Sequence, residues 1–271
     1  MKIKFLLSFV VITLLFSCSS NSSDSNTGTD SSVQTNYFPL AINNFWNYRV
    51  STNSNNQTDN LYISNDVTIN SKVYKKFKTT NTPVGFFSNS LNNNALRVDG
   101  AKLLLTGSLD FNNFGVALPV QLNLSVNDYI IFKENATNNE LLGSISGTLN
   151  QTVQNYPLVI EYTLNSTAVE TLPTFSSNGR VYTDVKKVKT VLNAKITSSI
   201  TVLGFSTIVR ILDAQDVVTS DQYYSKTIGN VYTKTTIDYR LNALPSGFTL
   251  PLPSSGNQIQ EEFLETYDVS H

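Results

Sequence analysis

The stretch 231–241, VYTKTTIDYRL, decides the fold class of this chain. Its odd-numbered residues are Val, Thr, Ile, Tyr and Leu, whereas its even-numbered residues include Lys, Asp and Arg. Because successive side chains of a β-strand point to opposite faces, this period of two predicts a strand with one face on a core and the other in water. Gly229-Asn230 has the composition of a turn, so we expect the chain to turn into this strand.

The same alternation recurs elsewhere in the chain, in residues 61–69, 118–126 and 158–164. Asn70-Ser71 and Asp99-Gly100 each stand between two such runs and predict hairpins, because Asp-Gly in particular suits the positive φ angles of a tight turn. Further strands are expected at 73–79, 96–98, 102–105, 196–202, 208–212 and 217–224.

Two segments fit more than one structure. Residues 181–192 also have helical spacing, but their Tyr, Thr and Val content favours a strand with an irregularity. Residues 259–269 fit either a helical turn or a last strand. No long helix is indicated anywhere, so the pattern predicts an all-β, antiparallel fold of about ten to twelve strands.

The composition excludes one class of partner. Only 14% of the 271 residues are charged, and solubility depends instead on 32 Asn, 31 Ser and 30 Thr. The net charge is −1, and no basic cluster is present that could bind phosphates, so nucleic acid is not an expected partner. The aromatic content of 11% is sufficient to build a core, which excludes wholesale disorder.

The N-terminus carries a secretory signal. Lys2 and Lys4 precede the apolar run 5–16, which is too short for a stable membrane span. Ser17-Cys18 follows, and this junction resembles the bacterial lipobox, which implies lipidation at Cys18 and attachment to a membrane through that anchor. The alternative is that Cys18 is an incidental residue of the signal peptide. We therefore expect residues 1–17 to be a lipoprotein signal peptide.

The rest of the chain divides into a tether and a body. Residues 18–36 contain the lipidated Cys and a flexible Ser/Asn tether with almost nothing apolar to bury, and residues 37–271 are expected to form a single all-β domain. Ser19, in place of Asp, favours the outer membrane. The isolated Asp24 and Asp30 favour a periplasm-facing protein, with surface exposure as the alternative.

Five short blocks resemble uncharacterised outer-membrane lipoproteins of the Bacteroidota. The first is 37–48, YFPLAINNFWNY, which resembles their opening strand. This resemblance implies a single large, strongly curved sheet, a half-barrel or open barrel similar to that of periplasmic lipoprotein carriers, and it implies no particular activity. The other four blocks are 68–74, 179–189, 223–232 and 263–269.

Known catalytic patterns are missing from the sequence. His271 is the only histidine and the last residue, so we expect no Ser-His-Asp or Cys-His site, no zinc site, no cofactor and no enzyme activity. Carboxylates that a glycosidase would need are predicted to face solvent, and the cluster 213–221 is expected to make turns rather than bind calcium. The carboxylates weighed are Glu161, Glu170, Asp213, Asp216 and Asp238.

The candidate ligand site is an apolar cleft on the concave face of the sheet. Trp46 is expected in the core, with a sugar-stacking platform formed with Phe45 and Tyr48 as the alternative. Segments 81–94 and 242–258 and the middle of the chain, about 116–170, are possible lids over the cleft. Residues predicted to line the cleft or its rim are Leu61, Ile63, Leu122, Leu124, Ile237, Tyr239, Phe86 and Phe87.

Three roles stay open. A non-catalytic scaffold of the envelope, with another envelope protein as partner, requires a concave face filled by side chains, for example by Leu244, Leu250 and Leu252. A carrier of a lipid or acyl ligand requires an open apolar cleft. A carbohydrate-binding lipoprotein requires a flat row of exposed Trp or Tyr beside paired acids, and the single Trp argues against this third role.

Overall fold

The computed structural model describes residues 36–52, 55–112, 118–202, 205–245 and 250–271. These residues belong to one compact unit, Val33–His271. The predicted signal peptide, Cys18 and the tether up to Thr35 lie outside the described residues. In the described part of the chain, no helix combines the length and apolar character that a membrane crossing requires.

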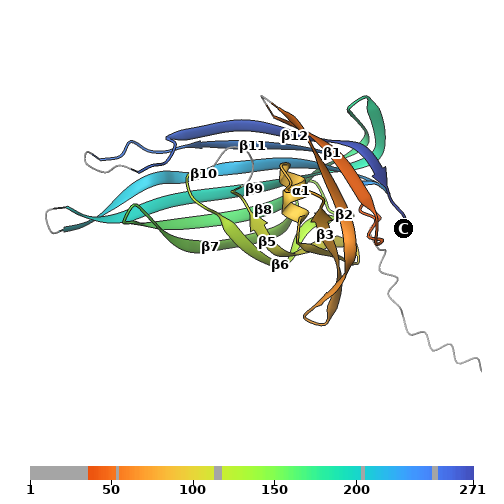
Figure 1. Cartoon of the computed structure of the whole chain (residues 1–271), viewed down its shortest axis with the longest axis horizontal. Helices are drawn as coiled ribbons and strands as arrows, with labels where there is room; N and C mark the ends of the chain where they lie inside the picture. Colours follow the sequence, from red (N-terminus) through yellow and green to blue (C-terminus); the bar gives the residue numbers. More distant parts are fainter. Residues whose placement is uncertain (1–35, 53–54, 113–117, 203–204, 246–249) are drawn as a thin grey trace, which may run out of the picture. The chain divides into compact units, whose positions relative to one another are not determined.

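The described chain forms twelve strands and one short helix (Figure 1). The elements are β1 (Phe45–Thr52), β2 (Asn56–Ile69), β3 (Lys72–Thr79), α1 (Phe86–Leu91), β4 (Ala95–Asp99), β5 (Lys102–Asp110), β6 (Asn123–Lys133), β7 (Leu141–Val153), β8 (Tyr156–Ser177), β9 (Arg180–Val202), β10 (Phe205–Ser225), β11 (Gly229–Arg240) and β12 (Ser255–Asp268).

All twelve strands belong to one antiparallel sheet, in the order β6-β5-β4-β3-β2-β1-β12-β11-β10-β9-β8-β7. The first strand pairs with the last, Trp46 opposite Tyr267, so the two halves of the chain join into one sheet. The sheet is curled so that its two edge strands, β6 and β7, approach each other. Strand β6 contacts both β7 and β8, but β6 and β7 are not paired by a hydrogen-bonded ladder. The predicted all-β fold with a single, strongly curved antiparallel sheet is confirmed.

Backbone irregularities occur at the positions where the chain turns or bends. Asn70 and Ser71 adopt φ angles of 49° and 63° in the turn between β2 and β3, as the predicted hairpin requires. Asp184 has a φ angle of 50° inside β9, so residues 181–192 form a strand with an irregularity. Short polar residues such as Asp and Asn tolerate this left-handed conformation best.

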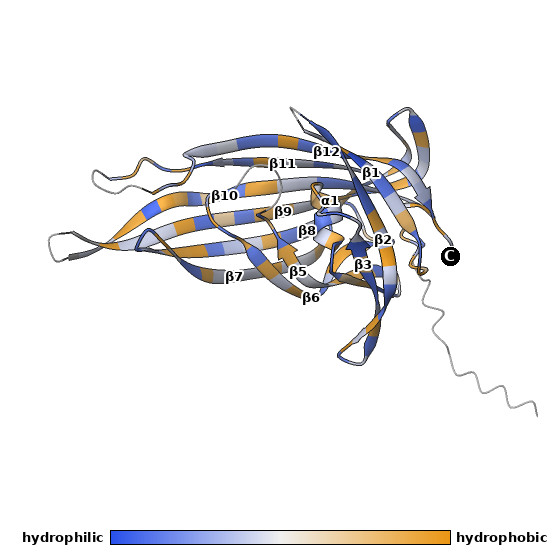
Figure 2. Cartoon of the chain, in the orientation of Figure 1, coloured by the Kyte–Doolittle hydropathy of each residue, from blue (hydrophilic) through white to orange (hydrophobic). Residues whose placement is uncertain are grey.

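The inner face of the curved sheet is an aromatic core. Trp46 is fully buried, stacks against Phe77 with ring centroids 6.2 Å apart, and donates its indole N–H to the carbonyl oxygen of Ile228 at 2.7 Å. Tyr48 is also fully buried and donates its hydroxyl to the carbonyl of Asn230 at 2.8 Å. Figure 2 shows apolar and polar residues alternating along the strands, as expected when one face of a sheet covers a core.

Three features differ from the sequence-based prediction. The expected strand 118–126 begins only at Asn123, because β5 and β6 start to pair at Asp110 and Asn123 and Pro119 cannot donate to a ladder. Strand β7 was not predicted. Its partly buried odd-numbered face carries Ile145, Leu149 and Val153, but Gly143, Gly147 and Gln151 stand between them and weaken the apolar pattern. The helix α1 was also not predicted, because six residues are too few to show helical periodicity.

Candidate functional site

The helix α1 lies within the curve of the sheet and occupies part of its interior. It contacts β2, β3, β5, β11 and β12 (Figure 1). Phe87 packs edge-on against Tyr48 and Tyr224, with centroid distances of 5.8 and 6.2 Å, and Phe86 packs against Phe111 at 6.1 Å. An isolated helix of six residues is unstable in water, so packing and polar contacts with the sheet must stabilise α1.

Polar side chains of the sheet bind the N-terminal end of α1. Asp59 of β2 accepts hydrogen bonds from the backbone N–H groups of Val84 and Gly85, the latter at 2.7 Å. Glu262 of β12 accepts the N–H of Phe87 at 2.6 Å, together with the N–H and hydroxyl of Ser88.

Gln260 completes this set, because its Oε1 accepts the N–H of Phe86 at 2.8 Å and its Nε2 donates to the carbonyl of Val84 at 2.8 Å. The helix has no side-chain cap of its own. Residues distant in sequence therefore satisfy the backbone donors that a helix start leaves unpaired. We call Asp59, Gln260 and Glu262 the helix clamp.

The two acids of the helix clamp are buried, with exposed fractions of 4% for Asp59 and 1% for Glu262. Burial, together with the negative charge of Asp59, raises the pKa of Glu262 to about 8, although the hydrogen bonds from Phe87 and Ser88 act to lower it. Burial also raises the pKa of Asp59 above its ordinary value, although the N–H groups of Gly85 and Val84 oppose this. Burial therefore favours the protonated form of both acids of the helix clamp.

The structure places all eight predicted ligand-binding residues in the packed core. Each has an exposed fraction of 3% or less, so they do not line an open cleft. The cavity beside Phe86 and Phe87, which Tyr129 and Leu164 also line, has a volume of about 30 Å³, close to the space of a single water and far below that of an acyl chain. The open cleft expected along the concave face is therefore replaced by a filled core at Leu61, Ile63, Leu122, Leu124, Ile237, Tyr239, Phe86 and Phe87.

The segments expected as lids account for part of this filling. Segment 81–94 contains α1, whose residues Phe86, Phe87 and Leu91 are buried. Leu250, from the proline-containing segment 242–258, is buried, and Leu244 and Leu252 are partly buried against the core. Side chains of both segments thus cover part of the concave face.

The edges β6 and β7 are held together by side chains. The hydroxyl of Tyr129 lies 3.5 Å from the carbonyl oxygen of Gly143 and 3.4 Å from that of Leu164, and Lys133 forms an ion pair with Glu140. A Cβ on Gly143 would approach the carbonyl oxygen of Ile130 to 2.8 Å. Close approach of the two edges thus requires glycine at position 143.

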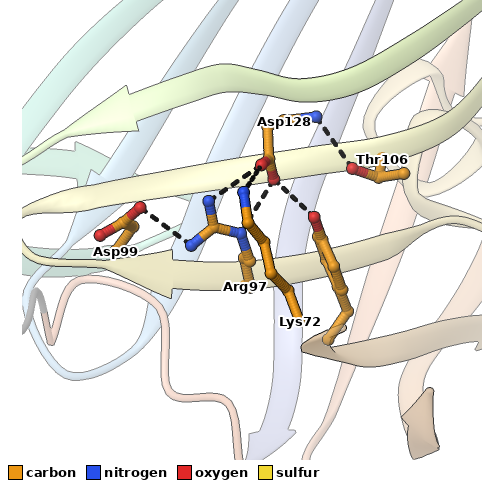
Figure 3. A network of polar contacts seen from close by, with 6 residues as sticks. Lys72, Arg97, Asp99, Thr106 and Asp128 are labelled. Carbon is orange, nitrogen blue, oxygen red and sulfur yellow. Dashed lines mark hydrogen bonds and ion pairs between the residues drawn. The ribbon is translucent and has the colours of Figure 1, made fainter. Parts of the chain in front are cut away.

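A polar network joins β3, β4 and β6 around Asp128 (Figure 3). The Asp128 carboxylate accepts hydrogen bonds from Tyr74 and Lys72 at 2.7 Å and two from the Arg97 guanidinium at 2.9 Å. These bonds, that with Arg97 above all, hold the pKa of Asp128 well below its usual range. Arg97 also reaches the exposed Asp99 at 2.9 Å. Every member of the network has a partner, so its role is to join neighbouring strands.

A row of aromatic rings runs across β8, β10, β11 and β12. Phe175 stacks on Tyr223 with centroids 4.2 Å apart and planes inclined by 16°, Tyr232 packs against both, and Phe263 packs against Tyr232 at 5.2 Å. The guanidinium of Arg49 lies 4.4 Å from the Phe263 ring centre. All four rings are partly buried.

Acidic groups adjoin this aromatic row, as the carbohydrate-binding role requires. Tyr232 donates its hydroxyl to Glu261, and Lys187, which lies 5.3 Å from the Tyr223 ring centre, forms an ion pair with Asp221. Only Phe175 and Tyr223 stack face to face, however, whereas the other ring pairs are tilted by 36° to 51°, and cations lie over the rings of Phe263 and Tyr223. Sugars stack on free ring faces that lie in one plane. The row instead has the geometry of aromatic side chains that pack against one another across strands.

Two larger hollows lie on the surface of the described chain. One has a volume of about 410 Å³ and is lined by Leu40, Val73, Val98, Arg97 and His271, among others. The other, of about 430 Å³, lies between the ends of β3 and β5 and the helix α1. We call the second hollow the asparagine pocket, because Asn81, Asn89, Asn92 and Asn93 line it with Lys78 and Asp110.

The sequence reasoning missed both the helix clamp and the asparagine pocket. The clamp had a usable signal, since Asp59 shares the odd-numbered face of Leu61 and Ile63, and Glu262 shares the face of Leu264. An acid within an apolar period-two face predicts a buried carboxylate. The pocket had no such signal, because its asparagines belong to loops and a short helix in a chain rich in Asn.

Comparisons with known proteins give little further information. No protein-family model matches this sequence, and no curated protein matches it significantly. One crystal structure, of a "putative lipoprotein" from Parabacteroides distasonis ATCC 8503, aligns with 86% of this chain and 99% of its own, at 12% identity and a TM-score of 0.35. A likeness this low supports no argument about this chain.

Proposed function

We propose that this protein is a lipid-anchored envelope lipoprotein with a non-catalytic scaffold or binding role. The filled interior of the sheet carries this proposal: α1 and the aromatic core occupy the space in which a carrier would hold its ligand. A core that is packed at all eight of the predicted cleft residues favours a role performed by the outer surface.

The anchor belongs to the proposal as well. Lys2, Lys4 and the apolar run before Ser17-Cys18 support export and lipidation at Cys18, and the absence of Asp at position 19 supports the outer membrane, with the body facing the periplasm. The described domain begins at Asn36, whose carbonyl accepts the N–H of Thr227 at 2.8 Å, so the start of the body is fixed to the sheet.

Metabolic labelling with an alkyne fatty acid tests the anchor. The wild-type chain is expected to take up label and to sediment with the outer membrane, whereas Cys18→Ala is expected to take up none and to accumulate as precursor. Ser17→Asn keeps the cysteine and serves as a processing control. Label on the Cys18→Ala chain would contradict the proposed anchor.

A second experiment separates the scaffold from the carrier role. The full chain is titrated with a fluorescent fatty acid, alongside Leu124→Asp, which places a charge in the core. The scaffold role predicts no saturable binding by the wild-type chain. Saturable binding that Leu124→Asp abolishes, with the variant still folded by circular dichroism, would favour the carrier role instead.

A further inference from the structure

The asparagine pocket differs from the hollow beside Leu40 and His271 in the chemistry of its walls. Its lining side chains are polar apart from Pro83, and its charged groups, Lys78 and Asp110, have opposite signs. Its volume of about 430 Å³ lies within the range of small-molecule sites. Such walls offer little to an apolar ligand and no net charge to an ion.

In two of the asparagines, one atom of the side-chain amide makes a hydrogen bond and the other does not. Asn89 donates its Nδ2 to the carbonyl of Asp110 at 2.9 Å, which leaves its Oδ1 without a hydrogen bond in the described structure. Asn92 accepts the N–H of Thr79 at 3.1 Å through its Oδ1, which leaves its Nδ2 without a partner among the described residues. Two side chains that line the pocket thus carry one acceptor and one donor without a partner in the described structure, each on an amide that a hydrogen bond holds.

The wall that carries these groups is itself held in place. The buried Asn94 donates to the carbonyls of Ser90 and Ser108 at 2.8 Å and accepts the N–H of Ser108 at 2.8 Å, which ties the end of α1 to β5. Asn93 donates its backbone N–H to the carbonyl of Phe77 at 3.0 Å. A preorganised wall loses little conformational entropy when a ligand binds.

From this geometry we infer that the asparagine pocket is a binding site for a neutral carbohydrate, a mono- or disaccharide or the end of a longer glycan. Sugar hydroxyls donate and accept at once, and amide side chains offer both functions side by side. A peptide strand fits less well, because β3 and β5 are internal strands without a free edge for pairing. The inference deepens the binding role proposed above and does not depend on the anchor.

Variants that preserve the fold can test the pocket. Asn93 has a φ angle of 59°, which glycine adopts without cost, so Asn93→Gly removes one amide and keeps the backbone. Asn92→Asp keeps an oxygen that accepts the N–H of Thr79 and removes the amide donor of this pocket-lining residue. Asn139→Gly is the matched control, since Asn139 is exposed, has a φ angle of 64° and lies in the loop before β7.

The experiment uses the full chain in a detergent without a sugar head group. Glucose, galactose, N-acetylglucosamine, maltose and cellobiose are tested by saturation-transfer NMR, and any sugar that binds is titrated by calorimetry. We expect saturable binding of at least one sugar, weakened about tenfold by Asn93→Gly and by Asn92→Asp, the effect of losing one hydrogen bond, and unchanged by Asn139→Gly.

Three outcomes would overturn the inference. The first is no saturable binding of any sugar by the wild-type chain. The second is sugar binding that both pocket variants retain at full strength, which would place the site elsewhere. The third is binding of inorganic phosphate or a polar peptide, sensitive to Asn93→Gly, with no sugar bound. Denaturant midpoints of all variants confirm that each is folded.

Discussion

Glu262 occupies the space in which a side chain at Gly85 would begin. A Cβ built on Gly85 would overlap the Glu262 carboxyl group and would come within 2.9 Å of Asp59 Oδ2. The φ and ψ angles of Gly85, −76° and 144°, are open to any residue. Glycine is therefore required here by the buried acids around it, not by its backbone conformation.

This relationship predicts the effect of Gly85→Ala. The methyl group displaces the Glu262 carboxyl group, so the buried N–H groups of Phe87 and Ser88 lose their acceptor. We expect a loss of about 2 to 4 kcal/mol in the free energy of unfolding, measured by urea denaturation.

A double-mutant cycle with Glu262→Ala isolates the steric part of this loss. Because removal of the carboxyl group makes room for the methyl group, the double variant should be more stable than the two single losses together predict. Additive losses would show that Gly85 and Glu262 are not coupled. Gly179→Ala provides a reference for a glycine with a positive φ angle and open space around it.

The helix clamp also predicts how stability depends on pH. The pKa of Glu262 is raised in the folded state, so the folded protein binds this proton more tightly than the unfolded chain does. The resulting stability is fully present below the unfolded pKa of 4.5 and is lost as the pH rises through about 8. The raised pKa of Asp59 acts in the same direction.

Urea melts of the wild-type chain between pH 5 and pH 9 test this sign, with Glu262→Gln as the comparison. The wild-type midpoint should fall as the pH rises, and the variant, which cannot ionise at this position, should show a flatter profile. Equal slopes would assign the pH dependence to other groups. Asp128, whose pKa is lowered, acts with the opposite sign only as the pH falls through acid values.

Asp128 predicts a second stability change. Asp128→Asn keeps a residue that tolerates the φ angle of 50° but replaces the carboxylate that Arg97, Lys72 and Tyr74 share. We expect a loss of about 1 to 3 kcal/mol, the scale of hydrogen bonds to charged groups. The control is Asp99→Asn, at a side chain that is 61% exposed, which should change stability by less than about 0.5 kcal/mol.

The sequence predicts the fold wherever apolar and polar residues alternate between the two faces of a strand. The stretch 231–241 forms β11 as its period of two predicts, and Thr233 and Thr235 lie buried beside Val231 and Ile237. Strand β7 also alternates, with Ile145, Leu149 and Val153 on its partly buried face, but two glycines and a glutamine interrupt that face and weaken the hydrophobic contrast, so the strand was not predicted.

The interior could not be predicted because it depends on contacts between distant residues. Nothing local to 84–88 shows that its N–H groups will meet Asp59, Gln260 and Glu262, which come from β2 and β12. When those partners are not known, the sequence of this segment predicts a loop, and the concave face is then predicted to be open. The expectation of a cleft at Leu61 and Ile63 followed from this missing helix.

Trp46 allows the core to be tested through two substitutions. Trp46→Ala empties a fully buried site that contacts Phe38 and Phe77, and we expect a loss of about 3 to 5 kcal/mol in the free energy of unfolding. Trp46→Phe fills part of the space but leaves the carbonyl of Ile228 without the indole donor at 2.7 Å, so its loss should be smaller, about 1 to 3 kcal/mol. Urea denaturation followed by far-UV circular dichroism measures both, since the chain has no other tryptophan to report by fluorescence. A loss below about 1 kcal/mol for Trp46→Ala is the scale of a surface change and would mean that the side chain faces solvent, against the filled interior on which the scaffold role depends.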